Sequence, residues 1–158
     1  MSPILKQATL LFLIKDNEIL LAMKKRGFGV GRLNGVGGKP ENDESIEQTA
    51  IRECQEEICV TPKGLKQVAT LDFYFPDSKS DWNQRVFVYF CTEWQGEPEE
   101  TDEMQPSWFK VKDIPYNEMW KDDKYWLPKV IDGNYVDAEF HFDDNDGVLD
   151  YKVRIRHD

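Results

Sequence analysis

Three glutamates share one face of a predicted helix. Glu53, Glu56 and Glu57 stand at positions i, i+3 and i+4 of the segment ESIEQTAIRECQEEICV, which begins at residue 44. Like charges at this spacing destabilise a helix by roughly 0.2–0.5 kcal/mol per pair. A divalent cation would remove the repulsion, because clustered carboxylates are the hard oxygen ligands that Mg²⁺ and Mn²⁺ prefer. A solvated acidic face is the alternative interpretation of the same pattern.

A glycine pair and an arginine favour the metal interpretation. Gly37 and Gly38 precede the acidic segment, and the backbone of such a turn approaches ligands closely because no Cβ intervenes. Arg52 stands one helical turn before Glu56, where its guanidinium can fix a carboxylate. Mg²⁺ in proteins usually works together with substrate phosphates. These residues therefore indicate chemistry on a phosphorylated substrate.

The spacing of these residues resembles the Nudix box. Gly38 is followed after five residues by Glu44 and, after seven more, by the run RECQEEIC at residues 52–59. The resemblance implies Mg²⁺-dependent hydrolysis of a nucleoside diphosphate linked to another group. It also implies that Glu53, Glu56 and Glu57 bind the metal together with the Gly37 carbonyl. Arg52 and Glu44 would orient these ligands.

One departure from the box concerns the end of the helix. We align Ile58 with the box glycine, which usually closes the helix in a left-handed conformation. A β-branched residue in that conformation costs roughly 1–2 kcal/mol, so we expect the helix end to be rebuilt locally. The acidic ligands precede Ile58, and we expect their chemistry to be retained.

Other segments are similar to one branch of the Nudix family, the MutT-like enzymes that hydrolyse oxidised purine nucleoside triphosphates such as 8-oxo-dGTP and 2-hydroxy-dATP. The resemblance implies water attack on the β-phosphorus, which yields a nucleoside monophosphate and pyrophosphate. It runs from about Thr9 to Ile155. The segments that carry it are KKRGFGVGRLNGVGGK (24–39), TDEMQPSWF (101–109), IPYNEMWKDDKYWLP (114–128) and VLDY (148–151).

Five residues have the chemistry to bind a purine base. Trp120 and Phe73 offer aromatic faces, and stacking on such a face contributes roughly 1–3 kcal/mol per base. Asn34 carries both a donor and an acceptor. If Asp122 and Asp123 enter one pocket, repulsion raises one pKa and leaves a proton donor beside an acceptor. In isolation the two acids would be a polar turn or a helix cap.

The resemblance adds further site residues. Glu103 would be another metal ligand, and either Glu56 or Glu103 would be the general base. Trp126 is assigned to packing. Near the expected pocket rim, Leu33 replaces a tryptophan and the loop PDSKSDWNQ is longer than in the relatives. These departures affect the predicted substrate preference more than the predicted reaction type. The remaining candidates for substrate contact are Thr9, Lys24, Phe28 and Met104.

Composition restricts the partners and the compartment. The chain has 158 residues, a formal net charge of −10 and three cysteines. We expect one domain spanning residues 1–158, and the acidic balance disfavours nucleic acid as a partner. The odd number of cysteines disfavours a disulfide framework and favours a cytoplasmic protein. The longest apolar run is too short for a membrane span, and we expect a monomer.

Hydrophobic periodicity predicts an α+β fold. Strands dominate the pattern, and two helices are expected, one after Ser45 and one over residues 123–131, with Pro128 in its middle. The expected architecture is the Nudix α/β/α sandwich, a curved mixed sheet with a catalytic helix and a C-terminal helix. The predicted strands are residues 9–14, 19–23, 68–75, 85–91, 108–111, 135–142 and 148–155, the last two forming a hairpin across Asp146-Gly147.

Three alternative functions differ from this interpretation. A Nudix enzyme with another modified or unmodified nucleotide substrate would keep the reaction and lose the preference for oxidised bases. A non-catalytic nucleotide sensor is disfavoured because all the box acids are present. A plain globular domain with an acidic helix would bind neither Mg²⁺ nor nucleotides.

Overall fold

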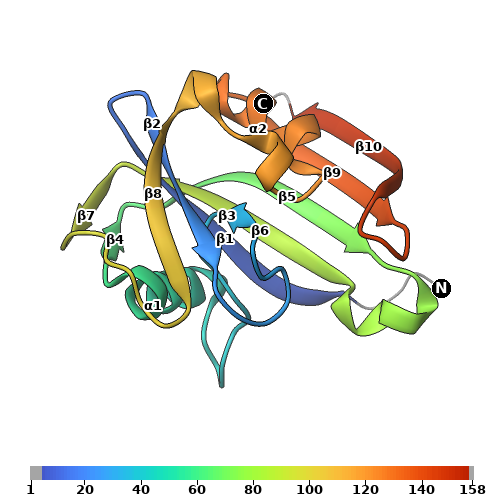
Figure 1. Ribbon diagram of the computed structural model, residues 1–158, viewed down its shortest axis with the longest axis horizontal. Coiled ribbons are helices and arrows are strands. Elements are labelled where there is room, and N and C mark those ends of the chain that lie inside the picture. The colour runs from blue at the N-terminus through green and yellow to red at the C-terminus, as the bar shows by residue number, and fades with distance from the viewer. Residues whose placement is uncertain (1–4, 157–158) are drawn as a thin grey trace.

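The computed structural model describes residues 5–156 as an open mixed sheet with an α-helix against each face (Figure 1). The sheet has the strand order β10-β9-β5-β6-β1-β2-β3, with β8 paired to β2, and β4 and β7 form a separate two-stranded sheet. The strands are β1 (Lys6–Lys15), β2 (Glu18–Lys24), β3 (Leu33–Asn34), β4 (Thr61–Lys63), β5 (Lys66–Tyr74), β6 (Gln84–Cys91), β7 (Glu93–Gln95), β8 (Met104–Lys110), β9 (Tyr135–Phe142) and β10 (Val148–Arg156).

The central strand β1 is buried on both faces. It pairs in parallel with β6 and antiparallel with β2. Successive side chains of a strand point to opposite faces, and here Leu11 and Leu13 pack in the core beside α1 (Ile46–Ile58), whereas Leu10 and Phe12 pack in the core beside α2 (Asp123–Ile131). Burial on both faces explains the continuous apolar run of β1.

The helix α1 begins as its capping residue predicts. Ser45 accepts a hydrogen bond from the Gln48 backbone N–H, and the Gln48 side chain accepts one from the Ser45 N–H. This reciprocal pair satisfies two backbone donors at the helix start. Ala50, Cys54 and Ile58 form the buried face that packs on the sheet.

The end of α1 corrects the prediction for Ile58. Ile58 is the last helical residue and is fully buried, while Cys59 adopts the left-handed conformation with φ of 64°. The Cys59 N–H donates to the Gln55 carbonyl. The helix therefore closes in the ordinary way one residue later than we expected, and any steric cost of a side chain in that conformation falls on Cys59.

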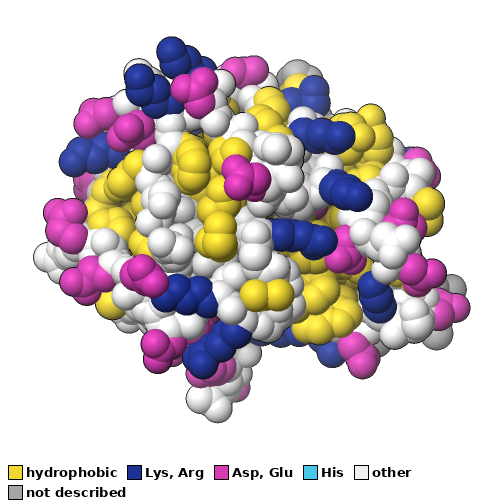
Figure 2. Space-filling model, in the orientation of Figure 1, with side chains coloured by type: hydrophobic (Ala, Val, Ile, Leu, Met, Phe, Trp, Pro, Cys, Tyr) yellow, Lys and Arg dark blue, Asp and Glu magenta, His cyan; other side chains and the backbone are white. Residues whose placement is uncertain are grey.

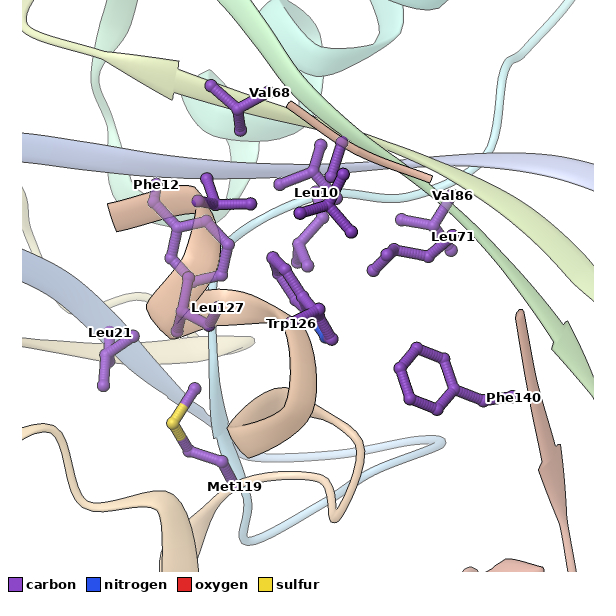
Figure 3. Packing of buried hydrophobic residues seen from close by; sticks show 14 of the residues in the cluster. Leu10, Phe12, Leu21, Val68, Leu71, Val86, Met119, Trp126, Leu127 and Phe140 are labelled. Atoms are coloured by element: carbon purple, nitrogen blue, oxygen red, sulfur yellow. The ribbon is translucent and has the colours of Figure 1, made fainter. Parts of the chain in front are cut away.

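The helix α2 fills the core on the opposite face of the sheet. Trp126 and Leu127 are fully buried, and Val130 is nearly so. Figure 3 shows Trp126 between Leu10 and Phe140, side chains contributed by the helix, β1 and β9. The packing of Trp126 agrees with its assignment from the sequence.

Four strands match their predicted ranges to within one residue at each end, namely β2, β6, β9 and β10, and the other predicted strands differ by more. The hairpin of β9 and β10 and the helix α2 lie where the pattern placed them, but β8 begins at Met104 rather than at residue 108. The segment PDSKSDWN, predicted as a loop, contains the 3-10 helix η1 (Asp77–Trp82). The short strands β3, β4 and β7 and the 3-10 helices η2 (Val111–Asp113) and η3 (Tyr116–Glu118) were not predicted.

Within residues 5–156, neither α-helix has the length and apolar composition that crossing a membrane requires.

Candidate active site

Arg52 organises the acidic face of α1. Its Nε and Nη2 donate to the two carboxylate oxygens of Glu44 at 2.7 and 3.1 Å. Its Nη1 donates to Glu53 at 2.7 Å and to Glu56 at 3.1 Å. The guanidinium is the main reason that the pKa of Glu44 falls to about 2. One fixed cation thus holds three carboxylates in place. The sequence predicts this contact for Glu56, and the family resemblance implies that Glu44 acts beside Arg52 in orienting the ligands.

Glu57 is buried beneath this face. Its side chain is 2% exposed, and its Oε2 has no hydrogen-bond partner. Its Oε1 accepts a hydrogen bond from the Gly37 N–H at 3.2 Å. Burial, followed by the neighbouring Glu53 carboxylate, raises the pKa of Glu57 to about 9. Burial disfavours the charged form of this carboxylate, and a nearby cation would favour it.

The Gly37-Gly38 turn is pressed against both β1 and the acidic face. The Thr9 N–H donates to the Gly38 carbonyl at 2.8 Å, and the Thr9 hydroxyl accepts from the Gly38 N–H at 3.2 Å. A Cβ on Gly38 would lie 2.5 Å from the Glu53 carboxylate carbon. A side chain at position 38 would therefore displace the Glu53 carboxylate, whereas a Cβ on Gly37 would lie 1.9 Å from the Thr9 carbonyl oxygen, so glycine is required at position 37.

These carboxylates suit a divalent cation in their chemistry, although they do not converge as a finished site. Across residues 5–156, no group of three acidic, histidine or cysteine side chains gathers as ready-made ligands. Arg52 is one reason why the carboxylates do not converge, because Glu53 and Glu56 both accept hydrogen bonds from its guanidinium. The partnerless Glu57 oxygen beside Glu53 is the place where a cation would relieve the burial of two acids.

Glu103 approaches the same region from the start of β8. Its charge contributes to raising the pKa of Glu57, and its carboxylate lies 3.6 Å from the guanidinium of Arg26. Glu103 therefore lies within electrostatic range of Glu57 and is paired with Arg26.

A pocket of about 210 Å³ adjoins the glycine turn. It collects side chains from both cores, from the segment 24–39 and from the residues before α2. Figure 2 shows lysine and arginine side chains among the apolar side chains on one face of this acidic protein. The lining residues are Ala8, Thr9, Leu10, Ala22, Lys24, Phe28, Gly29, Arg32, Asn34, Gly35, Gly37, Gly38, Lys39, Phe73, Phe75, Trp82, Gln84, Val86, Met104, Trp120, Asp122, Asp123 and Phe142.

Aromatic rings form one wall of the pocket. The Phe28 ring centroid lies 4.9 Å from that of Trp120, and the Arg32 guanidinium carbon lies 4.0 Å from the Trp120 ring. Phe73 lies against Phe142, with centroids 5.6 Å apart. The structure therefore brings all three predicted aromatic residues to one cavity, which has room for a flat apolar ligand.

Asp122 and Asp123 are both buried at the same pocket, each 2% exposed. The Trp126 indole N–H donates to Asp122 at 2.8 Å, whereas one oxygen of Asp123 has no partner. Burial raises the pKa of Asp122 to about 6. Burial and the adjacent Asp122 carboxylate raise the pKa of Asp123 well above its usual value. Asp123 thus keeps its proton longer than Asp122, and a donor stands beside an acceptor.

The other predicted substrate residues also line this cavity. Asn34 on β3 uses its side-chain oxygen to accept the Gly35 N–H at 2.9 Å, which fixes the orientation of the amide. Lys24 and Met104 lie on paired strands, β2 and β8. Thr9 lines the pocket as well, but its hydroxyl and its backbone N–H form hydrogen bonds with Gly38 of the glycine turn.

Sequence reasoning missed several side chains of the pocket, three of which carry a charge or an indole ring. Arg32, Lys39 and Trp82 all line it. The extended loop before β6 was a signal for Trp82, because a long insertion near a pocket rim often carries function. Nothing local marked Arg32, whose place depends on its contact with Trp120 across the fold.

Comparison with known proteins gives a consistent assignment. The NUDIX domain model matches residues 5–130. The chain is 38% identical over 146 residues to an oxidized purine nucleoside triphosphate hydrolase of Mus musculus, covering 92% of each chain. It is 36% identical over 148 residues to the protein of the same description from Danio rerio, covering 94% of each. A crystal structure of a MutT protein from Bacillus halodurans superposes with a TM-score of 0.79 at 25% identity, covering 94% of this chain and 97% of that one.

Proposed function

Because the chain belongs to the Nudix family of hydrolases, we propose that it hydrolyses oxidised purine nucleoside triphosphates to the monophosphate and pyrophosphate in a Mg²⁺-dependent reaction. Its similarity to oxidised purine nucleoside triphosphate hydrolases extends over nearly the whole chain. The observation that carries the proposal is a buried Asp122–Asp123 pair in the same cavity as Trp120, next to the turn that contacts the acidic helix.

The acidic helix supports the phosphate chemistry. Glu53, Glu56, Glu57 and Glu103, with the Gly37 carbonyl, would hold Mg²⁺, or Mn²⁺ in its place. The bound ion would neutralise charge on the phosphates and lower the pKa of a water. The Arg52 guanidinium keeps Glu53 and Glu56 oriented at 2.7 and 3.1 Å.

One glutamate takes the proton of the attacking water. Glu56 is the better candidate for this base because it is exposed on the helix face and therefore open to solvent, while Glu103 is the alternative. Water attacks the β-phosphorus, the bond from that phosphorus to the bridging oxygen of the α-phosphate breaks, and the nucleoside monophosphate leaves, while the water oxygen stays on the pyrophosphate. Positioning and electrostatic stabilisation supply most of the rate in such a reaction.

The pocket supports recognition of the base. The Trp120 ring offers a stacking surface, and Asn34 offers its amide nitrogen because its oxygen already accepts the Gly35 N–H. Asp122 as acceptor and Asp123 as donor match adjacent donor and acceptor groups on a purine edge. Because their proton can be redistributed, the same pair would accept both an oxidised guanine and an oxidised adenine.

Product analysis tests the proposal directly. The protein with Mg²⁺ is given 8-oxo-dGTP, 2-hydroxy-dATP and dGTP in separate reactions and in competition, and products are separated by chromatography. Preferred conversion of an oxidised triphosphate to monophosphate and pyrophosphate is expected. The matched control is Glu56→Gln, which keeps the shape of the helix face. Equal turnover of all three substrates would refute the preference, and equal turnover by the variant would assign the activity to a contaminant.

Two rival functions would give different results. A Nudix enzyme with another substrate would cleave none of the oxidised purines preferentially. A nucleotide sensor would bind them without turnover, in the wild type as in Glu56→Gln.

A monomeric enzyme in the cytoplasm is also part of the proposal. Within the described chain Cys54, Cys59 and Cys91 are all free thiols, which suits a reducing compartment.

A further inference from the structure

The 3-10 helix η1 delivers Trp82 to the mouth of the pocket. The Asn83 side chain accepts the Phe75 N–H at 2.6 Å, and the Asn83 N–H donates to the Ser80 carbonyl at 3.0 Å. On the other side, the Lys79 ammonium donates to the Asp144 carbonyl at 2.7 Å. In Figure 1 η1 is the light green coil beyond the end of β5. These contacts tie the segment to β5 and to the β9–β10 turn, so the position of Trp82 is fixed from both ends.

Trp82 contacts one aromatic residue and one cation. The Phe28 ring stacks on it with centroids 3.9 Å apart and an interplanar angle of 13°. The Lys39 ammonium lies 5.4 Å from the Trp82 ring centroid. Because Phe28 covers one face of the indole, the cation is attracted to the opposite face, where the ring quadrupole is negative.

Both contacts lead toward the places where a nucleotide would bind. Phe28 lies between Trp82 and Trp120, 4.9 Å from the Trp120 centroid. The carbonyl of Lys39 accepts a hydrogen bond from Arg52 Nη2 at 3.0 Å, on the side of the acidic helix. Trp82 therefore stands between the aromatic wall that would hold a base and the helix that would hold phosphates.

Lys39 is a cation without a carboxylate partner among residues 5–156, whereas Arg26 and Arg52 each have one. An unpaired ammonium at the rim of a pocket is available to an anionic ligand. The exposed fraction of Trp82 is 36%, so part of its indole remains accessible at the pocket mouth.

We propose that Trp82 is a positioning residue for nucleotide binding, which holds the Phe28 ring against the base pocket and the Lys39 ammonium over the phosphate path. The inference rests on the proposed function. It assigns to the extended segment before β6 a part in substrate affinity that acts through two other residues.

Equilibrium binding without metal tests this role separately from turnover. Titration calorimetry is used with 8-oxo-2′-deoxyguanosine, 8-oxo-dGMP and dGMP, on the wild type and on Trp82→Ala, Trp82→Phe and Lys39→Gln. The control is Trp94→Ala, which removes a tryptophan stacked on Trp108 at 5.8 Å and outside the pocket lining. Thermal unfolding of every variant measures any loss of stability.

The two contacts predict different patterns. Trp82→Ala is expected to weaken binding of both nucleoside and nucleotide about tenfold, which is about 1.4 kcal/mol, because the Phe28 ring loses the indole that supports it. Trp82→Phe is expected to restore binding to within about threefold of the wild type, because a ring is retained. Lys39→Gln is expected to weaken the nucleotide about threefold and leave the nucleoside unchanged. The double variant Trp82→Ala/Lys39→Gln is expected to bind like Trp82→Ala, since Lys39 is then no longer held in place.

The outcomes separate this inference from the proposed function. Wild-type preference for 8-oxo-dGMP with unchanged binding by Trp82→Ala overturns the inference alone. Equal losses in Trp82→Ala, Trp82→Phe and Trp94→Ala also overturn it, because they reveal a general loss of structure. Equal wild-type affinity for 8-oxo-dGMP and dGMP, with the expected loss in Trp82→Ala, overturns the oxidised-base preference and supports the inference. Absence of binding by the wild type overturns both.

Discussion

The buried acid Asp123 makes stability depend on pH. Its carboxyl is 2% exposed, one oxygen has no partner, and burial with the adjacent Asp122 raises its pKa well above 3.8. The folded state therefore keeps the Asp123 proton after the unfolded state has released it. The stability from this proton is fully present below about pH 4 and is lost as pH rises through the raised pKa.

Asp123→Asn removes this titration and keeps a donor beside Asp122. One proton bound only by the folded state costs about 1.4 kcal/mol of unfolding free energy per pH unit. Asp122, whose pKa is about 6, titrates before Asp123. Over the two units from pH 5 to pH 7, the unfolding free energy of the variant should therefore gain up to about 3 kcal/mol relative to the wild type, the limit for one proton that the folded state keeps throughout.

Urea unfolding between pH 5 and pH 7, followed by tryptophan fluorescence, measures this difference. Asp113→Asn, at an exposed position in η2, controls for the loss of a carboxylate as such. If the free energies of the wild type and Asp123→Asn run parallel across the range, Asp123 ionises in the folded protein as it does in the unfolded chain. That result would refute both the raised pKa and the donor role assigned to Asp123.

Three other substitutions test the acidic helix and its surroundings. Arg52→Lys keeps the charge but loses the paired hydrogen bonds to Glu44, so Mg²⁺ affinity and turnover should fall about tenfold or more. Titration of the activity with Mg²⁺ measures both quantities. An unchanged titration curve would contradict the orienting role of Arg52. Cys59→Gly relieves the steric strain of a side chain in the left-handed conformation at φ of 64° and should stabilise the protein by about 1 kcal/mol. The expected result is a higher urea concentration at the midpoint of unfolding. A lower midpoint would contradict the strain at Cys59. Gly38→Ala places a Cβ 2.5 Å from the Glu53 carboxylate and should lower turnover at least about tenfold with little change in nucleotide affinity; normal kcat would show that the turn yields without displacing Glu53.

Local spacing explains why much of the acidic site was predictable. Glu53, Glu56 and Glu57 lie within about one turn of one helix, and Arg52 reaches Glu53 and Glu56 from the same helix. The capping pair of Ser45 and Gln48 sets where that helix begins. Such contacts need only the periodicity of the helix, so the sequence is sufficient to place them.

The end of the helix was placed one residue too early for a related reason. Choosing between Ile58 and Cys59 as the left-handed residue requires knowing which side chain is buried against the sheet. Ile58 is fully buried in the core beside α1, whereas Cys59 is exposed. Packing therefore decided the boundary, which the pattern of residue types left open.

By itself the sequence determined the family, the acidic helix and many of the residues that line the pocket. The tertiary structure decided the features that depend on contacts between distant segments. The raised pKa values of Asp122 and Asp123 depend on their burial, which outweighs the lowering effect of the Trp126 indole. The place of Trp82 against Phe28 depends on anchors more than sixty residues away, at Asp144. Burial and stacking arise only when distant segments pack together, so no local pattern of residues specifies them.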